Sequence, residues 1–180
     1  MLTTAPVNEM GGTILLPGGE TIAYRHIQPG DLEALQRFHS LLSERSVYQR
    51  FFGFMPLLSD RQAAFFTGAE GADRVALVAL DPEQPGEIIG VVRIDRDPGT
   101  DAAEYAAIVA DRWQGHGVAF GLTQLIVEEA KARGINRLFA LVLPENIQML
   151  NFLRSLGYPE RVRFIEGVER VELVLNSKGS

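Results

Sequence analysis

The stretch Trp113–Gly134, WQGHGVAFGLTQLIVEEAKARG, places two glycines directly before a long amphipathic segment. From Val118 onward apolar residues recur at helical spacing, which predicts a helix over 118–133 that ends at Gly134. The first N–H groups of a helix have no partner within it and carry a partial positive charge. Glycines at such an end let the backbone close around a phosphate or diphosphate. A tight strand-to-helix turn without a ligand explains the same glycines equally well.

Two common phosphate loops do not match this stretch. A dinucleotide-binding loop needs a third glycine at position 120, where Phe120 stands, and Gly121 comes one residue late. A nucleoside-triphosphate loop needs Gly-Lys followed by Ser or Thr, and the stretch has no lysine beside its glycines. The stretch therefore belongs to neither class.

Composition narrows the class of protein. The chain has 180 residues, enough for one domain with a sizeable core, and 46% of them are apolar. Its formal net charge of −6 argues against a nucleic-acid partner. The chain has no cysteine, and His26, His39 and His116 lack the spacing of a metal site. Without an apolar run of about 18 residues or a signal-peptide pattern, we expect no membrane partner and a cytoplasmic location.

The hydrophobic pattern predicts one α/β (α+β) domain over residues 13–180, preceded by a flexible tail over residues 1–12. The order of elements favours a mixed, mostly antiparallel sheet flanked by helices. Helices are expected over 31–44, 60–67 with Ser59 as the cap, 118–133 and 145–156. Strands are expected over 13–16, 21–26, 75–80, 88–94, 103–110, 138–143, 161–165 and 169–176.

The loop sequence Gln114-Gly115-His116-Gly117-Val118-Ala119 resembles the acyl-CoA loop of the GNAT superfamily of N-acetyltransferases, Q/R-x-x-G-x-G/A. The segment 143–158, with Asn146 near a helix start and a closing Leu-Gly-Tyr, resembles the motif that follows in that family. The resemblance implies acetyl-CoA as cosubstrate, with no metal. It also implies a splayed strand pair that holds acyl-CoA. Loop amides would bind the diphosphate, and backbone groups near Ile108 and Val109 would bind the pantetheine and the acyl carbonyl.

Two side chains of this region are open to more than one interpretation. His116 is either an exposed turn residue or a phosphate contact. Asn146 caps its helix, binds CoA, or does both.

A narrower resemblance covers roughly residues 13–175. The segments 46–52 (SVYQRFF), 58–59, 73–80 and 102–104 are similar to the Pat-type bacterial protein lysine acetyltransferases. This resemblance implies a protein partner with a reactive lysine, and it places the catalytic glutamate of the group at Glu104.

Glu104 also stands out from the residues alone. If 103–110 is a strand, Glu104 shares a face with Ala106 and Ile108, and burial among small apolar neighbours would raise the pKa of its carboxyl. An acceptor lysine is an ammonium, and only the neutral amine attacks a thioester, so the reaction needs a base. An exposed, solvated carboxylate at the strand end is the alternative, which the resemblance disfavours.

The sequence departs from many GNAT enzymes at one position and leaves the acceptor open. Leu153 stands where the family often has a tyrosine that serves as general acid. A protein lysine acetyltransferase that works by direct attack in a ternary complex is the leading hypothesis. A small-molecule amine N-acetyltransferase and a non-catalytic acyl-CoA-binding module are the alternatives. The oligomeric state is not predicted.

Overall fold

The computed structural model describes residues 11–68, 71 and 73–176, so residues 1–10 of the predicted tail lie outside the described part. Within it, eight strands form one sheet in the order β1-β2-β3-β4-β5-β6-β8-β7. The strands are β1 (Gly12–Leu15), β2 (Thr21–His26), β3 (Arg74–Leu80), β4 (Ile88–Arg96), β5 (Ala102–Val109), β6 (Arg137–Val142), β7 (Glu160–Ile165) and β8 (Val168–Val174). The helices are α1 (Leu32–Ser40), α2 (Glu44–Phe51), α3 (Asp60–Thr67), α4 (Val118–Ala132) and α5 (Ile147–Ser155).

Neighbouring strands pair antiparallel throughout the sheet except β5 and β6, which pair parallel. The mixed, mostly antiparallel sheet expected from the sequence is therefore confirmed. Strands β3 and β4 are buried along almost their whole length, because both faces of the sheet are covered there.

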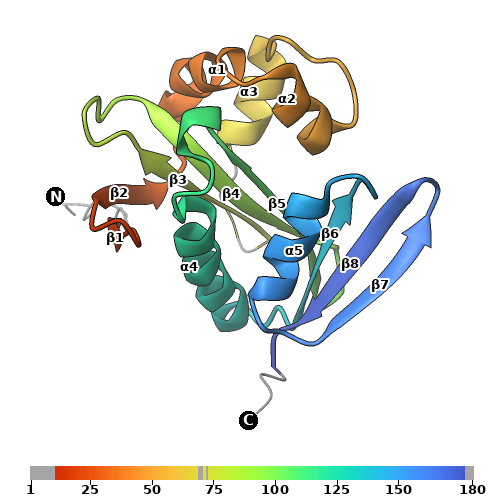
Figure 1. Cartoon of the computed structure of the whole chain (residues 1–180). Helices are drawn as coiled ribbons and strands as arrows, with labels where there is room; N and C mark the ends of the chain where they lie inside the picture. The colour runs from red at the N-terminus through yellow and green to blue at the C-terminus, as the bar shows by residue number, and fades with distance from the viewer. Residues whose placement is uncertain (1–10, 69–70, 72, 177–180) are drawn as a thin grey trace, which may run out of the picture.

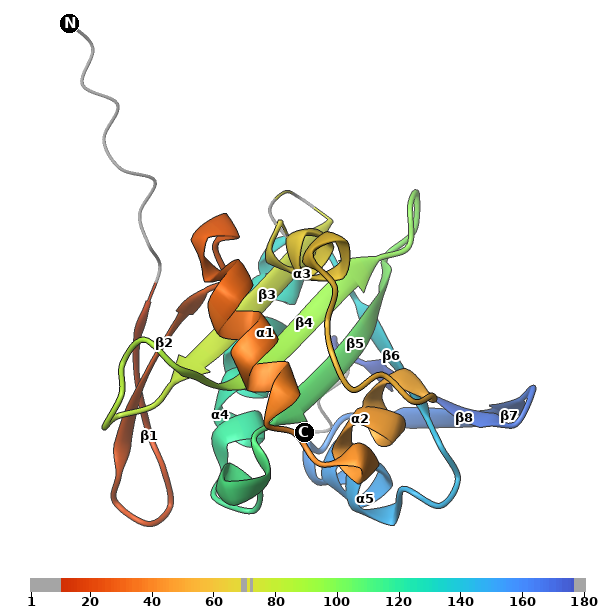
Figure 2. The same cartoon turned by 90° about the horizontal axis from the view of Figure 1, so that it is seen from above.

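Helices α1, α2 and α3 cover one face of the sheet, and α4 and α5 lie on the other (Figure 1). The larger core cluster joins the α4 and α5 face of the sheet to residues such as Leu122, Ile126 and Leu153. A smaller cluster on the opposite face holds Leu35 and Phe38 of α1. Strands β1 and β7 form the two edges, and the β7–β8 hairpin extends beyond the helices (Figure 2). None of the helices described is long and apolar enough to cross a membrane.

The predicted helix over 31–44 is shorter in the structure, and only its last residue, Glu44, belongs to a second helix. Helix α1 ends at Ser40, and α2 begins after Ser43, whose hydroxyl accepts the Ser46 N–H at 3.1 Å. The Ser43 N–H donates to the carboxylate of Asp111, 68 residues further along the chain. This tertiary contact favours a helix cap at Ser43, which the local hydrophobic period does not reveal.

Helix α4 matches its prediction closely and packs against β1. Gly134 follows its end with a φ of 74°, the left-handed conformation that glycine adopts readily. Gly121, which fits no phosphate-loop motif, faces Ile14 of β1. A Cβ at position 121 would lie 2.6 Å from Ile14 Cγ2, so this glycine serves close helix–strand packing.

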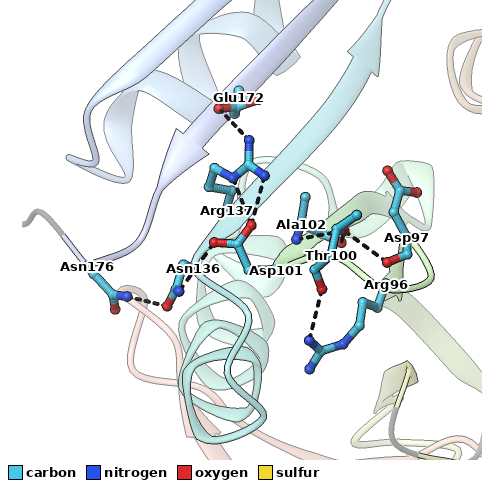
Figure 3. Close-up of polar contacts among 9 residues, drawn as sticks. All are labelled: Arg96, Asp97, Thr100, Asp101, Ala102, Asn136, Arg137, Glu172 and Asn176. Atoms are coloured by element: carbon cyan, nitrogen blue, oxygen red, sulfur yellow. Dashed lines mark hydrogen bonds and ion pairs between the residues drawn. The ribbon is translucent and has the colours of Figure 1, made fainter.

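A polar cluster joins the starts of β5 and β6 (Figure 3). The main-chain oxygen of Asp101 accepts the N–H groups of Asn136 and Arg137 at 2.8 and 3.2 Å. Its carboxylate accepts Nε and Nη2 of Arg137 at 3.1 and 2.8 Å, and Arg137 also pairs with Glu172 of β8. The β5 and β6 strands are therefore held together at this end.

We expect Gly121→Ala to destabilise the protein by about 1 kcal/mol in denaturant unfolding. Overpacking a core typically costs about 1–3 kcal/mol, which exceeds the gain of about 1 kcal/mol from the better helix propensity of alanine. In an Ile14→Ala background, where the clashing methyl groups are absent, the same change should stabilise. If Gly121→Ala raised the stability of the otherwise unchanged chain, the packing role of Gly121 would be wrong.

Candidate active site

The parallel pair β5–β6 is the origin of the main cavity. Its register covers only Ala102 to Glu104 on β5, paired with Arg137 to Phe139 on β6. Beyond these residues the two strands diverge, and a cavity of about 480 Å³ occupies the gap. Residues of α2 line it from one face of the sheet, and residues of α4 and α5 line it from the other. The splayed strand pair expected from the sequence is thus present.

Alternate residues of β5 direct their backbone groups to opposite neighbours. The Ala110 N–H donates to Ile89 of β4 at 2.8 Å, and β5 pairs with β4 without a bulge. By alternation, Ile108 directs its N–H and C=O toward β4, whereas Ala107 and Val109 direct theirs toward the gap. Ile108 therefore contributes its side chain to the cavity, and Val109 contributes backbone groups. Sequence reasoning did not identify Ala107, because the direction of its backbone depends on strand pairing.

The glycine loop presents a series of free N–H groups. Gly115 and Gly117 have φ values of 78° and 91°. The first backbone hydrogen bond of α4 runs from the Gly121 N–H to the Gly117 oxygen at 3.0 Å. Within the described part of the chain, the N–H groups of residues 115–120, which include Val118 and Ala119, have no hydrogen-bond acceptor. Six adjacent donors at the positive end of a helix are suited to bind an anion such as a phosphate group.

The side chain of Gln114 holds the loop against β5. Its Nε2 donates to the Val109 oxygen at 3.0 Å and to Ser46 Oγ at 3.1 Å. The Ser46 hydroxyl donates in turn to a carboxylate oxygen of Asp111 at 3.2 Å. Gln114 therefore ties together the loop, the end of β5 and helix α2.

Two basic side chains near the loop do not line the cavity. The His116 ring packs on Trp113, with ring centroids 5.6 Å apart. Arg112 pairs with the buried carboxylate of Asp81. The unpaired donors that the loop presents to the cavity are therefore its main-chain N–H groups.

Asn146 is buried and lines the cavity where α5 begins. Its side-chain oxygen accepts the Met149 N–H at 3.1 Å, so it is the N-cap of α5. The cap uses only the oxygen, which leaves the amide N–H groups of the same side chain for a ligand.

Glu104 lines the cavity at the point where β5 and β6 begin to diverge, opposite Asp95 of β4. Its side chain retains access to solvent, yet its surroundings raise the pKa of its carboxyl. Partial burial is the main cause, opposed first by the nearby cation of Arg50 and reinforced by the Asp95 carboxylate. Glu104 is therefore a stronger base than an ordinary carboxylate.

Leu153 faces the larger core and is 1% exposed. The cavity wall on α5 is formed by Gln148, Met149 and Phe152. Helix α5 therefore offers no proton donor at the Leu153 position. Tyr105 does not substitute for one, because its hydroxyl bonds to Thr123 Oγ1 at 2.6 Å on the buried face of α4.

Sequence reasoning left the roles of Ser46 and Arg50 unassigned. Both lie on α2 and line the cavity, with Arg50 close enough to Glu104 to lower the pKa of that carboxyl. In the sequence, the segment 46–52 stands out only by its resemblance to the Pat-type group. The available signal for Arg50 is its position directly before two aromatic residues, Phe51 and Phe52.

Comparisons with known proteins agree with this geometry. A model of the acetyltransferase (GNAT) family matches residues 35–158. The GNAT domain of S. lividans PAT shares 37% sequence identity with the chain at a TM-score of 0.84, and the match covers 91% of this chain and 96% of that one. Family members use acetyl-CoA as cosubstrate, and the six free N–H groups and the adjoining cavity fit its diphosphate and its arm.

Two more distant structures share the fold. An acetyltransferase of the GNAT family from Streptococcus pneumoniae has 22% identity and a TM-score of 0.67, with 85% of this chain and 98% of that chain covered. A cAMP-binding acyltransferase from Mycobacterium smegmatis has 23% identity and a TM-score of 0.65. That match covers 94% of this chain but 48% of the M. smegmatis chain, so this chain spans about half of it.

We expect Ala119→Pro to weaken coenzyme A binding about 10- to 100-fold in calorimetry. The change removes one free N–H, and a hydrogen bond to a charged group contributes about 1.5–3 kcal/mol. The first turn of a helix tolerates proline, so the melting temperature should change little. The control Ala119→Gly keeps the N–H and should bind nearly as the unchanged protein does. Equal coenzyme A affinities of the two variants would show that the N–H of residue 119 does not bind the diphosphate.

Proposed function

This chain belongs to the GNAT family of acetyltransferases, and on that basis we propose that it transfers an acetyl group from acetyl-CoA to the amine of a protein lysine, with Glu104 as general base. The observation that carries the proposal is one cavity that extends from the free N–H groups of the loop to Glu104. The same cavity thus adjoins a diphosphate site and a carboxylate suited to take up a proton.

Acetyl-CoA supplies the acyl group as a thioester. The N–H groups of residues 115–120 bind its diphosphate, and the Asn146 amide adds a donor from α5. The backbone groups of Ala107 and Val109 face the gap between β5 and β6, where they orient the arm. A main-chain N–H in that position also stabilises negative charge on the acyl oxygen.

Glu104 removes the proton that keeps the acceptor lysine charged, directly or through one water. Its raised pKa strengthens it as a base, and its access to solvent lets the proton leave afterwards. The neutral amine then attacks the thioester carbonyl directly in a ternary complex. The amide C–N bond forms, the C–S bond breaks, and coenzyme A leaves as a thiolate. Ser46 is not the nucleophile in this scheme. Its hydroxyl donates to the Asp111 carboxylate and accepts from the Gln114 amide.

A protein acceptor is supported by the resemblance to the Pat-type group and by the surface next to α2. The chain is 37% identical to the GNAT domain of S. lividans PAT over 91% of its length. Beside the cavity, Phe54 and Leu57 are 79% and 70% exposed in the segment that joins α2 to α3. Exposed apolar groups of this size are typical of surfaces that contact another protein.

We expect Glu104→Gln to lower acetyl transfer by about 10²- to 10⁴-fold, which is the usual contribution of a positioned base. Its affinity for acetyl-CoA should stay close to that of the unchanged protein, because the variant keeps the loop. A free-thiol assay with candidate proteins and small amines measures the first quantity, and calorimetry measures the second.

The matched control is Asp97→Asn, since Asp97 lies near enough to raise the pKa of Glu104 but does not line the cavity. It should keep most of the activity. Undiminished turnover by Glu104→Gln would exclude Glu104 as the base. Coenzyme A binding without thiol release for any amine would identify a non-catalytic binding module.

We expect Arg50→Met to raise the pKa of the Glu104 carboxyl further, because the Arg50 cation lowers it. A carboxylate acts as a base only when ionised, so the acidic limb of the pH–rate profile should move to higher pH. Carbon-13 NMR of the labelled carboxyl group reports the same titration without interference from the acceptor amine. A shift to lower pH, or none, would contradict the electrostatic coupling of these two residues.

A further inference from the structure

A buried guanidinium without a partner lies beside the cavity that contains Glu104. Arg93 of β4 is 7% exposed, and its Nη1 is buried with no hydrogen-bond partner in the described part of the chain. Its guanidinium carbon lies 4.5 Å from the centre of the Phe66 ring. A charge buried without a hydrogen-bonding counterion is costly, so a site that retains one calls for a ligand or a structural reason.

A second arginine faces the same space. Arg50 of α2 forms no hydrogen bond or ion pair with the described residues, and its guanidinium lies 4.6 Å from the Phe51 ring. A small cavity of about 30 Å³ is lined by both Arg50 and Arg93. This exceeds the roughly 10–15 Å³ that one water requires, so a small polar group has room beside both arginines.

The small cavity adjoins the large one. Arg50, Phe51, Ala106 and Ile108 line both cavities. Arg93 pairs with Ala106 across the β4–β5 register, two residues along β5 from Glu104. The two arginines therefore lie on the same face of the sheet as Glu104 and next to it.

The charges on this face do not balance. Asp95 of β4 already pairs with Arg74 of β3 at 2.8 Å. The remaining charged groups that act on this site are the cations of Arg50, Arg93 and Arg170 and the carboxylates of Glu104 and Asp97. Glu104 forms no ion pair with a described residue, and it loses its charge when it acts as a base. One cation remains uncompensated before proton uptake and two afterwards.

We propose that Arg50 and Arg93 form an anion subsite that binds a carboxylate of the acceptor, close to the amine that receives the acetyl group. This inference rests on the proposed function, because it assigns the acceptor's place in the same cavity. The carboxylate is either an acidic side chain beside the acceptor lysine in a protein or the α-carboxylate of a free amino acid. Guanidinium groups bind carboxylates through charge-assisted, often bidentate hydrogen bonds.

Such a ligand would also assist the base. Burial and the neighbouring Arg50 lower the pKa of Arg93 to about 9, so the two cations disfavour each other in the empty subsite. Arg50 likewise lowers the pKa of Glu104. A bound carboxylate offsets both effects, because it neutralises the cations and lets Glu104 take up a proton more readily.

The test compares paired acceptors in the free-thiol assay with acetyl-CoA. One pair consists of lysine peptides that differ only in Glu or Gln beside the lysine, and the other is lysine against lysine amide. We expect the carboxylate member of one pair to be preferred about 10- to 100-fold in kcat/KM. The first pair reports an acidic side chain as the source, and the second reports an α-carboxylate.

In Arg93→Met the preference should fall to a ratio near one. Replacing a buried, unpaired charge by an apolar side chain should leave the melting temperature unchanged or raised. Arg93→Lys keeps the charge and should retain part of the preference. Arg170→Met is the matched control, since Arg170 also stacks on a ring and lowers the pKa of Glu104, but it lines neither cavity. It should keep the ratio of the unchanged protein.

A second measurement does not need catalysis. Titration with acetate should shift the arginine Nε NMR signals of Arg50 and Arg93, whereas acetamide, which has no carboxylate, should not. Equal transfer to both members of each pair, together with unshifted signals, would overturn the subsite and leave the acetyltransferase proposal intact. Shifted signals without transfer to any acceptor would support the subsite and count against the proposed function.

Discussion

The divergence of β5 from β6 is the constraint on which the site depends. The two strands pair parallel for only three residues, and the Asp101–Arg137 cluster holds them together at that end. Beyond it, the backbone groups of Ala107 and Val109 lose their expected partners on β6, and the cavity opens. A fully paired sheet would satisfy those groups internally and leave no room for a ligand. The Asp101–Arg137 cluster at one end and the gap at the other therefore both follow from the short pairing of β5 with β6.

The same strand joins the two chemical ends of the cavity. Glu104 lies where β5 leaves β6, and the glycine loop follows where β5 ends. The loop presents main-chain N–H groups, so an anion site there depends on local donors and not on the net charge of −6. Gln114 fixes the glycine loop relative to the end of β5 by donating hydrogen bonds to Val109 and to Ser46 of α2. Cofactor loop, strand and acceptor-side helix are thereby held in one hydrogen-bonded unit.

On the acceptor side, burial and charge act against each other. Arg50 of α2 and Arg93 of β4 both stack on aromatic rings, and neither has an ion-pair partner among the described residues. The Arg50 cation lowers the pKa of Glu104, against the effect of burial. The strand register sets Arg93 and Asp95 opposite Ala106 and Glu104, so these charged side chains lie on one face of the sheet.

The sequence by itself determined the elements whose signals are local. The α4 helix with Gly134 behind it, the Ser59 cap of α3 and the β7–β8 hairpin all follow from hydrophobic period and turn chemistry. The glycine loop and its family could likewise be recognised from residues 114–119. The tertiary structure alone decided what depends on partners distant in the chain. It separated α1 from α2 through the Asp111–Ser43 contact, directed Val109 rather than Ile108 toward the gap, and enclosed Arg93 beside Arg50. These outcomes depend on strand register and on burial, which no local pattern encodes.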